Sequence, residues 1–357
     1  MKILYVITGL AQGGAERVVC DLANSMYEKG HEVKIVYLTG EILTRPGYNE
    51  IEIIKINLNN FFSLFNAYVN LKKFIECYQP DVVHSHMVHA NLLTRLVRLS
   101  VPIKKLISTA HSDNEGGVLR MRLYRLTHHL SDLTTNVSTY ASQSFVKKKA
   151  VPQNGISTIY NGVDFNNFTY HSDANKKIKD ELNIDSQDRI LLAVGRFHAA
   201  KNYPNLIEAI GLLSKKVNNF VLLIAGDGDL RPEIEAYIQK QKIENRIRLL
   251  GRRSDIPTLM SACDVFILSS NYEGLPTVLI EALACQAHAV STDVSGAREI
   301  LATNGEIVPI NSPVNLAQSI EILLDKKHKN KMGAEYVRKK FDLNIISDQW
   351  LEIYYEK

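Results

Sequence analysis

The two halves of the chain begin in the same way, with an apolar strand, a glycine-bearing turn and a helix. In the first half the apolar run 2–7 leads into Gly9, Gly13 and Gly14, and a helical pattern starts at residue 15. In the second half the run 190–194 leads into Gly195, and a helical pattern starts at residue 205. Further apolar strands then alternate with helices, at 31–38, 81–84, 105–108, 220–225, 247–250 and 265–268. Such alternation predicts an α/β fold with two parallel, doubly wound sheets.

The low-periodicity stretch between the halves predicts where the domains divide. Residues 166–188 are rich in Asn, Asp and Lys and have little apolar periodicity, so we interpret them as a linker. We therefore expect domains at 1–165 and 189–340, with a helix at 341–357 that packs back on the first domain. Open α/β sheets bind ligands beyond the carboxyl ends of their strands. Two such Rossmann-like domains facing one another would hold the active site in an interdomain cleft.

Composition and charge narrow the classes of protein that this chain can be. With 357 residues, 45% of them hydrophobic and 22% charged, it is long enough for two globular cores. The four cysteines are scattered without metal-ligand or redox spacing. The chain has neither a bilayer-length apolar run nor a signal-peptide pattern, so we expect a cytoplasmic protein.

A basic excess lies in the first half of the chain. Residues 61–150 hold 12 Lys and Arg against 5 Asp and Glu, although the whole chain has a net charge of only +4. Such a surface attracts anionic membranes, polyanions or phosphorylated acceptors. A basic surface that is merely solvated explains the same excess equally well.

Two glutamates stand eight positions apart across a turn in the second half. Glu273 lies on the turn after the strand 265–268, and Glu281 lies in the helix that follows. Pro276 suits the first helical turn, and together with Gly274 it leaves the backbone amides of the helix start free to face an anion. By itself, this spacing fits two glutamates on a solvated helix equally well.

Cations and glycines follow the first strand of each half. Arg196 and Lys201 come just after Gly195, where two positive charges favour an anion such as a diphosphate. Gly13 and Gly14 stand at a helix start and permit close approach of a ligand. We find no G-x-G-x-x-G fingerprint at a strand end, which disfavours a nicotinamide enzyme.

The histidines and one aspartate pair could suggest a metal site, but their spacing does not support one. Asp227 and Asp229 lie in a strand-to-helix turn, and the alternation of His84, His86 and His89 does not direct all three rings to one face. His111 follows the strand 105–108, from where its side chain can enter the cleft or serve as a structural hydrogen-bonding group.

Taken together, these motifs resemble the family-four retaining glycosyltransferases of the GT-B fold, in which two facing Rossmann-like domains transfer a sugar from a nucleotide donor. The resemblance covers nearly the whole chain, in family order. Its motifs are residues 13–17, 80–86, 109–111, 161–164, Gly195 and Arg196 with Lys201, 225–228, and the pair of glutamates from Glu273 to Glu281.

The resemblance implies a role for each matching residue. Arg196 and Lys201 would bind the donor diphosphate, and Glu281 would hold the ribose. Glu273, with the turn that carries Gly274 and Leu275 and the helix start at Pro276 and Thr277, would contact the donor sugar. Gly13 and Gly14 would close over the phosphates, His111 would lie beside the sugar or acceptor, and Arg252 and Arg253 would meet the nucleobase.

This resemblance implies a metal-independent, retaining hexosyltransferase in bacterial surface polysaccharide biosynthesis, such as that of O-antigen, capsule or exopolysaccharide. The expected donor is a nucleotide-sugar used as substrate, most simply a UDP-sugar, with no cofactor. The expected acceptor is a saccharide, in particular a lipid-linked one, which would bring the protein to the inner face of the plasma membrane. We expect no nucleic-acid partner. The alternatives are a nucleotide-sugar epimerase or phosphorylase, and a non-enzymatic nucleotide-sugar-binding protein on the same fold.

Overall fold

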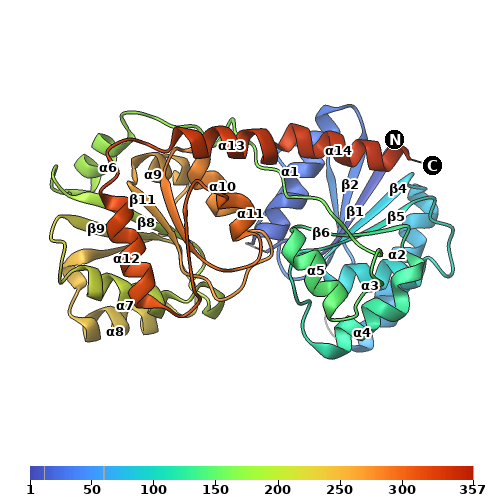
Figure 1. The fold of residues 1–357 in the computed structure, drawn as a ribbon. Coiled ribbons are helices and arrows are strands. Elements are labelled where there is room, and N and C mark those ends of the chain that lie inside the picture. Colours follow the sequence, from blue (N-terminus) through green and yellow to red (C-terminus); the bar gives the residue numbers. More distant parts are fainter. Residues whose placement is uncertain (12, 59–60, 357) are drawn as a thin grey trace. The chain divides into compact units, whose positions relative to one another are not determined.

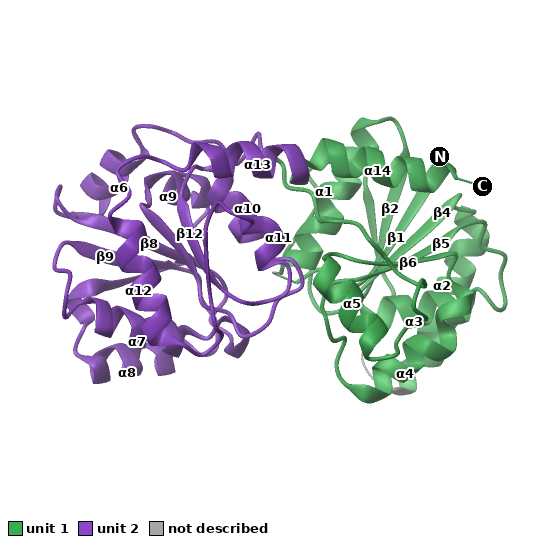
Figure 2. Ribbon diagram, in the orientation of Figure 1, with its two compact units in different colours: residues 1–164, 341–357 green, residues 165–340 purple. Residues whose placement is uncertain are grey.

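A computed structural model describes residues 1–11, 13–58 and 61–356 of the chain (Figure 1). The chain divides into two compact units (Figure 2). Unit 1 contains residues 1–164 and 341–357, and unit 2 contains residues 165–340. Each unit is built on one parallel sheet with helices on both faces, which confirms the predicted α/β fold class.

Unit 1 carries a seven-stranded parallel sheet with the order β3-β2-β1-β4-β5-β6-β7. Its strands are β1 (Lys2–Gly9), β2 (Glu32–Thr39), β3 (Glu52–Lys55), β4 (Val82–His86), β5 (Leu106–Ala110), β6 (Leu133–Asn136) and β7 (Ser157–Thr158). Its helices are α1 (Gly14–Glu28), α2 (Leu64–Tyr78), α3 (Val88–Val97), α4 (Val118–Thr127), α5 (Thr139–Lys147) and α14 (Leu343–Tyr355), with short 3-10 turns η1 (Phe61–Ser63) and η2 (His128–Leu130).

Alternate residues of β1 build the cores on opposite faces of this sheet. Ile3, Tyr5 and Ile7 pack with residues of α1 and α14, whereas Leu4 and Val6 pack with residues of α2 and α3. All five side chains are fully buried. A strand covered on both faces has no need of polar residues, which explains the continuous apolar run at the start of the chain.

Unit 2 repeats this plan with a six-stranded parallel sheet of order β10-β9-β8-β11-β12-β13. The strands are β8 (Arg189–Val194), β9 (Phe220–Ala225), β10 (Ile247–Gly251), β11 (Val265–Leu268), β12 (His288–Thr292) and β13 (Glu306–Val308). The helices are α6 (Ala174–Leu182), α7 (Tyr203–Leu213), α8 (Arg231–Gln241), α9 (Ile256–Ala262), α10 (Thr277–Ala284), α11 (Ala297–Leu301), α12 (Pro313–Leu324) and α13 (Lys331–Phe341), with turns η3 (Ala199–Lys201) and η4 (Glu244–Arg246).

The segment 166–188, which we interpreted as a linker, lies within unit 2 and contains a helix. Helix α6 packs against α9. The side-chain amide of Asn175 donates to the carbonyl of Ala262 over 2.7 Å, and Ala174 and Ile178 are buried. Ala174, Ile178 and Leu182 recur every four residues, as on one face of a helix, but the polar residues between them obscured this short period in the sequence. The chain passes between the units after Asp164 and again before Phe341.

The last helix belongs to unit 1, although it follows unit 2 in the sequence. Helix α14 packs against α1, and Figure 1 shows the red helix beside the blue one. Trp350 is 4% exposed in this contact. The hydroxyl of Tyr354 lies 3.2 Å from that of Tyr5 on β1 and 2.7 Å from Nδ1 of His84 on β4. The helix is therefore fixed to the sheet by apolar contacts and by buried hydrogen bonds.

Cys20, Cys263 and Cys285 are buried, Cys77 is exposed, and all four are free thiols. Among the helices in the described ranges, none combines the length and apolarity that crossing a bilayer requires.

Replacing Trp350 by alanine should test how much α14 contributes to unit 1. Removing a buried Trp side chain costs about 3–5 kcal/mol of unfolding free energy, so we expect a clearly lower urea midpoint for unit 1. Tyr355, on the same helix, is 62% exposed and provides the matched control. If Trp350→Ala and Tyr355→Ala unfolded at the same urea concentration, α14 would not stabilise the unit.

Candidate functional site

The candidate residues of unit 2 lie where the strand order of its sheet reverses. The chain builds outward from β8 to β9 and β10, then returns to the other side of β8 with β11. Gly195, Arg196 and Lys201 follow β8, and Glu273 follows β11. Because β8 and β11 are parallel neighbours, their carboxyl ends meet at one edge, and the loops after them contact one another there. Open sheets bind ligands at this switch point.

Lys201 and Glu273 form the central contact of this edge. Nζ of Lys201 lies 2.7 Å from Oε1 of Glu273, and the hydroxyl of Ser270 donates to the same oxygen over 2.7 Å. The two charged side chains are 22% and 18% exposed, so the pair is largely shielded from solvent. This contact confirms that residues 72 positions apart meet, as their strand-end positions suggested.

Arg196 adds a second cation at the same strand end. Its side chain is exposed, and it forms no ion pair within the described part of the chain. The charge of Lys201 is matched by Glu273, whereas that of Arg196 is not matched by any acid in those residues. The edge therefore has positive charge to offer to an anion.

Close packing of turns explains the glycines after β8 and β9. A Cβ at Gly226 would lie 1.9 Å from the carbonyl oxygen of Gly195, and a Cβ at Gly228 would lie 2.6 Å from that of Phe197. The turn at 225–228 thus crosses directly beside the loop after β8, which Tyr203 also holds by donating to the carbonyl of Gly195 over 2.8 Å. These glycines therefore allow two backbone segments to cross closely.

The turn after β11 is held by groups that the sequence pattern did not reveal. The amide of Asn271 donates to the carbonyl of Ala200 over 2.7 Å. The hydroxyl of Thr292 donates to the carbonyl of Ser270 over 2.6 Å, and that of Ser295 donates to the carbonyl of Gly274 over 2.9 Å. Serine and threonine are common in loops and at strand ends, so the sequence carried no signal that singled these residues out.

The remaining predicted residues of this turn lie around the start of α10. Leu275 is 7% exposed and Pro276 is the N-cap of the helix, with Thr277 as its first residue. Glu281 lies one turn further along α10 and is half-buried. The backbone amides of a helix start favour negative charge nearby.

The two arginines after β10 differ in their surroundings. Arg252 is exposed. Arg253 donates to both carboxylate oxygens of Asp255 and to Glu181 of α6, each over 2.7 Å. These ion pairs raise the pKa of the Arg253 guanidinium further above its ordinary value. Arg253 therefore ties α6 to the loop before α9, and only Arg252 keeps a side chain suited to a ligand contact.

In unit 1 the glycines lie at the start of α1, after the central strand β1. Gly13 is the N-cap of α1 and Gly14 is its first residue, and both are exposed. Strand order reverses here too, between β1 and β4. The predicted meeting of these glycines with the groups of unit 2 stays a prediction.

His111 lies next to a cluster of buried imidazoles in unit 1. Its Nε2 is 3.0 Å from Nδ1 of His86, the last residue of β4. The His86 ring lies on that of His84, with centroids 4.0 Å apart, and Nε2 of His84 is 2.7 Å from the hydroxyl of Thr109. Burial lowers the pKa of His84 and His86 well below the ordinary value and lowers the pKa of His111 to about 4. All three rings are therefore neutral at pH 7.

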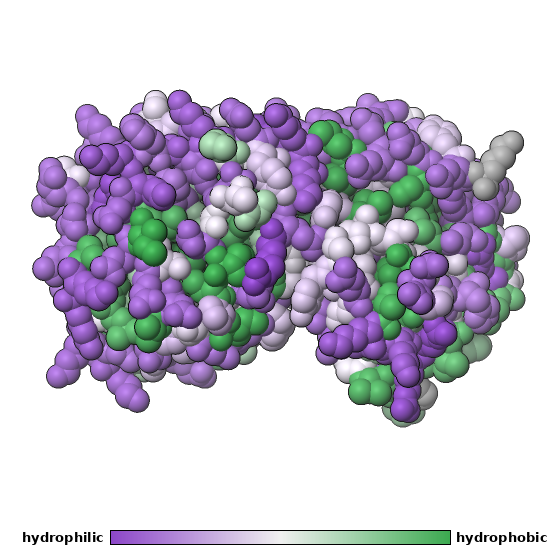
Figure 3. Space-filling model, in the orientation of Figure 1, coloured by the Kyte–Doolittle hydropathy of each residue, from purple (hydrophilic) through white to green (hydrophobic). Residues whose placement is uncertain are grey.

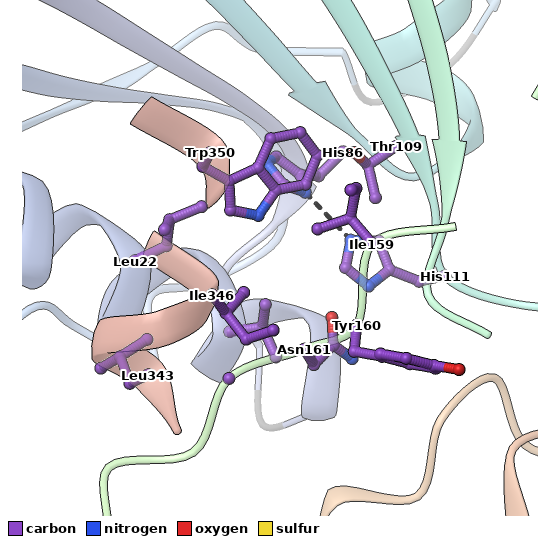
Figure 4. A pocket seen from close by; sticks show the side chains of 12 residues that line it. Leu22, His86, Thr109, His111, Ile159, Tyr160, Asn161, Leu343, Ile346 and Trp350 are labelled. Atoms are coloured by element: carbon purple, nitrogen blue, oxygen red, sulfur yellow. Dashed lines mark hydrogen bonds between the residues drawn. The ribbon is translucent and has the colours of Figure 1, made fainter. Parts of the chain in front are cut away.

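A small cavity of about 10 Å³ adjoins this cluster, which is room for one water molecule. Its lining includes His86 and His111 from the ends of β4 and β5, and Ile346 and Trp350 of α14 (Figure 4). Tyr160 and Asn161 close the same cavity from the segment after β7. No group of three or more His, Cys, Asp or Glu side chains within the described ranges is placed to hold a metal ion.

Two family models match the chain, one on each unit. The model described as Glycosyltransferase Family 4 matches residues 12–167, and that described as Glycosyl transferases group 1 matches residues 174–340. Their boundaries agree with the division between the units.

Relatives and solved structures extend over the full length. The GalNAc-alpha-(1->4)-GalNAc-alpha-(1->3)-diNAcBac-PP-undecaprenol alpha-1,4-N-acetyl-D-galactosaminyltransferase of Campylobacter jejuni is 28% identical, over 99% of this chain and 98% of its own. The N-acetyl-alpha-D-glucosaminyl L-malate synthase of Bacillus anthracis is 24% identical, over 100% and 97%. Among solved structures, Anabaena Alr3699/HepE in complex with UDP has a TM-score of 0.85 at 19% identity, covering 99% of both chains.

The buried imidazoles of unit 1 should make it sensitive to acid. Unfolded histidines have the ordinary pKa of 6.5, whereas that of folded His111 is about 4. Between these values the unfolded chain binds protons that the folded unit does not, so stability falls as pH falls. Each such proton contributes about 1.4 kcal/mol per pH unit.

We therefore expect the unfolding free energy of unit 1, measured in urea, to decrease from pH 7 to pH 5. Replacing His86 by phenylalanine should reduce the dependence of the unfolding free energy on pH by up to the contribution of one proton, about 1.4 kcal/mol per pH unit. An unchanged pH dependence would mean that folding does not lower the pKa of His86.

Proposed function

Because this chain belongs to the family-four glycosyltransferases, we propose that it transfers a hexose or N-acetylhexosamine from a UDP-sugar to a saccharide acceptor, with retention of the anomeric configuration. The observation that carries this proposal is the Lys201 and Glu273 contact, 2.7 Å long and shielded from solvent at the switch point of unit 2. Alr3699/HepE, which has the same fold, binds UDP, and this supports UDP as the nucleotide.

Arg196 and Lys201 are suited to a diphosphate leaving group. When the bond between the anomeric carbon and the diphosphate breaks, the electron pair goes to a phosphate oxygen. Two cations that already stand at one strand end stabilise that charge without first having to be assembled. Lys201 is held by Glu273 before the donor arrives, so little reorganisation is required. A metal ion is then unnecessary, and we expect transfer to persist in the presence of a chelator.

The contacts of Glu273 favour a role as anchor of the donor sugar. Its Oε1 accepts from both Lys201 and Ser270. These two contacts hold the carboxylate in one orientation before the donor binds, as an anchor requires. We propose that Oε2 accepts from a sugar hydroxyl, and that the proton of the attacking acceptor hydroxyl goes to an oxygen of the departing diphosphate.

The acceptor class follows from the relatives. The Campylobacter jejuni enzyme acts on a saccharide carried by PP-undecaprenol, and relatives from Rhizobium meliloti and Erwinia amylovora serve lipopolysaccharide core and amylovoran biosynthesis. We propose a lipid-linked saccharide acceptor in surface polysaccharide biosynthesis.

Replacing Lys201 or Glu273 by alanine should lower the rate of sugar transfer at least about 100-fold, or roughly 2.7 kcal/mol. Lys216 also pairs with a glutamate, Glu321, over 2.9 Å, but on the exposed surface. Lys216→Ala is therefore the matched control and should transfer sugar at the wild-type rate. Near-wild-type rates for both site variants would remove this assignment.

A panel of nucleotide-sugar donors tests the reaction itself, with the product linkage read by NMR. An α-linked donor should give an α-linked product and free UDP. An inverted product would rule out retention. Epimerised donor without acceptor would indicate an epimerase, and sugar-phosphate formed only with inorganic phosphate would indicate a phosphorylase. Donor binding without turnover on any acceptor would indicate a binding protein.

Helix α4 supports contact with an anionic membrane. Its outward face, which we call the α4 face, exposes large apolar side chains beside arginines: Val118, Leu119, Arg122, Leu123, Arg125 and Leu126. Residues 116–131 contain no acid. Figure 3 shows apolar and strongly hydrophilic side chains together at the end of unit 1 that carries α4. Apolar and cationic groups on one helix face suit the interface of an anionic bilayer.

Vesicle sedimentation tests the α4 face. The protein should bind phosphatidylglycerol vesicles at low salt and bind phosphatidylcholine vesicles much less. Replacing Arg122 and Arg125 by alanine should weaken binding about 25-fold, at roughly 1 kcal/mol for each arginine. Val314 of α12, 53% exposed, offers a control, since Val314→Ala should bind as wild type. Self-association without vesicle binding would assign the face to a protein partner instead.

A further inference from the structure

His86 lies behind His111, and no family motif gave it a role of its own. It ends β4, is 1% exposed, and lies with its Nδ1 3.0 Å from Nε2 of His111 (Figure 4). His111 directly follows β5 and is only partly buried. Its backbone amide donates to Glu115 over 3.0 Å, which holds the chain at this point. The ring of His111 is therefore held from behind by His86.

Both rings are neutral, so a single proton lies between them. Burial lowers the pKa of each imidazole. A neutral imidazole carries its proton on one of its two nitrogens. If Nδ1 of His86 is the donor, then the proton of His111 must be on its Nδ1. If Nε2 of His111 is the donor, then the proton of His86 must be on its Nε2. The contact thus links the tautomers of the two rings.

The other nitrogen of His86 distinguishes these two arrangements. Nε2 of His86 is buried and has no hydrogen-bond partner in the part of the chain that the structure describes. The adjoining cavity of about 10 Å³ is at the lower size limit for a water molecule, and a water there would find few partners because most of the lining side chains are apolar, among them Leu22, Ile346 and Trp350. A buried N–H without an acceptor is rarer in folded proteins than an acceptor without a donor. We therefore favour the tautomer of His86 in which Nε2 carries no proton and Nδ1 carries the proton.

We propose that His86 is a positioning residue, which donates its Nδ1–H to Nε2 of His111 and thereby fixes His111 as the Nδ1–H tautomer. The two nitrogens of an imidazole point in widely different directions, so Nδ1 of His111 faces away from His86. His111 then presents a hydrogen-bond donor to an oxygen of the sugar or acceptor. This last step rests on the proposed function, whereas the tautomer does not.

Nitrogen-15 NMR of the full-length protein with labelled histidine reads the tautomer directly from the ring correlations. We expect His111 to show Nδ1–H in the wild type. In His86→Phe, which keeps a ring but has no donor, His111 should shift to Nε2–H, the form that free imidazole prefers. Finding Nε2–H in the wild type, or no response to His86→Phe, would overturn the proposal.

Two amide substitutions separate the hydrogen bond from packing. Asparagine places its amide near the position of Nδ1, whereas glutamine places it near that of Nε2. His86→Asn should keep the Nδ1–H form of His111 and most of kcat. His86→Gln and His86→Phe should lose about tenfold in kcat with little change in donor KM, since a misplaced group acts on the chemical step. Equal losses in all three variants would show that His86 acts only by packing.

His84 provides the control for general damage to the cluster. It is as deeply buried as His86, but its nitrogens contact Tyr354 and Thr109. His84→Phe should lower the melting temperature while leaving the His111 tautomer unchanged. If it changed the tautomer as much as His86→Phe does, the proposal would be wrong.

The proposed tautomer and the proposed transfer reaction can be disproved independently of one another. A wild-type protein with the Nδ1–H form of His111 but no transfer from any donor would remove the proposed function alone. Transfer with His111 in the Nε2–H form would remove only the role of His86.

Discussion

The rest of the structure depends on the order in which the chain adds strands to each sheet. In each unit the sheet grows outward from its first strand and then begins again on the other side, at β4 and at β11. Sheets of this strand order bind ligands at the carboxyl edge beside the two central strands. In unit 2 the loops after these strands meet there, through Lys201 and Glu273 and through Asn271 and Ala200. Helix packing and apolar strands maintain the arrangement, but strand order determines where chemistry is possible.

The ion pair of Lys201 and Glu273 at this edge is unusual because both side chains are largely shielded from solvent. Shielding a charged pair costs desolvation energy that the attraction between the charges only partly offsets. The hydroxyl of Ser270 and the backbone contacts of the neighbouring turn offset more of this cost. Such a pair contributes little to the stability of the fold. Ligand binding therefore explains better than stability why the two charges are held together. It keeps a cation and a carboxylate in place before an anion arrives.

The sequence was sufficient for the fold class, because apolar periodicity is a local signal. The family and the grouping of residues after β8 with those after β11 came from the resemblance of ordered motifs to a known family. The sequence was insufficient for α6, because that polar helix buries few side chains. It also missed Ser270, Thr292 and Ser295, whose hydroxyls act on backbone groups that are distant in sequence. In the sequence Arg253 and Arg252 were equal candidates for a ligand contact, because the ion pair of Arg253 with Glu181 forms only in the folded chain.

The place of α14 has a consequence for how the protein is made. Unit 2 is one continuous stretch of chain, whereas unit 1 needs residues from both ends. During synthesis the first 164 residues can form their sheet, but the apolar surface that α14 covers stays open until unit 2 has been translated. At ribosomal rates this delay lasts roughly 10 to 40 seconds. Unit 2, the later one to be translated, is therefore the first that can complete its core.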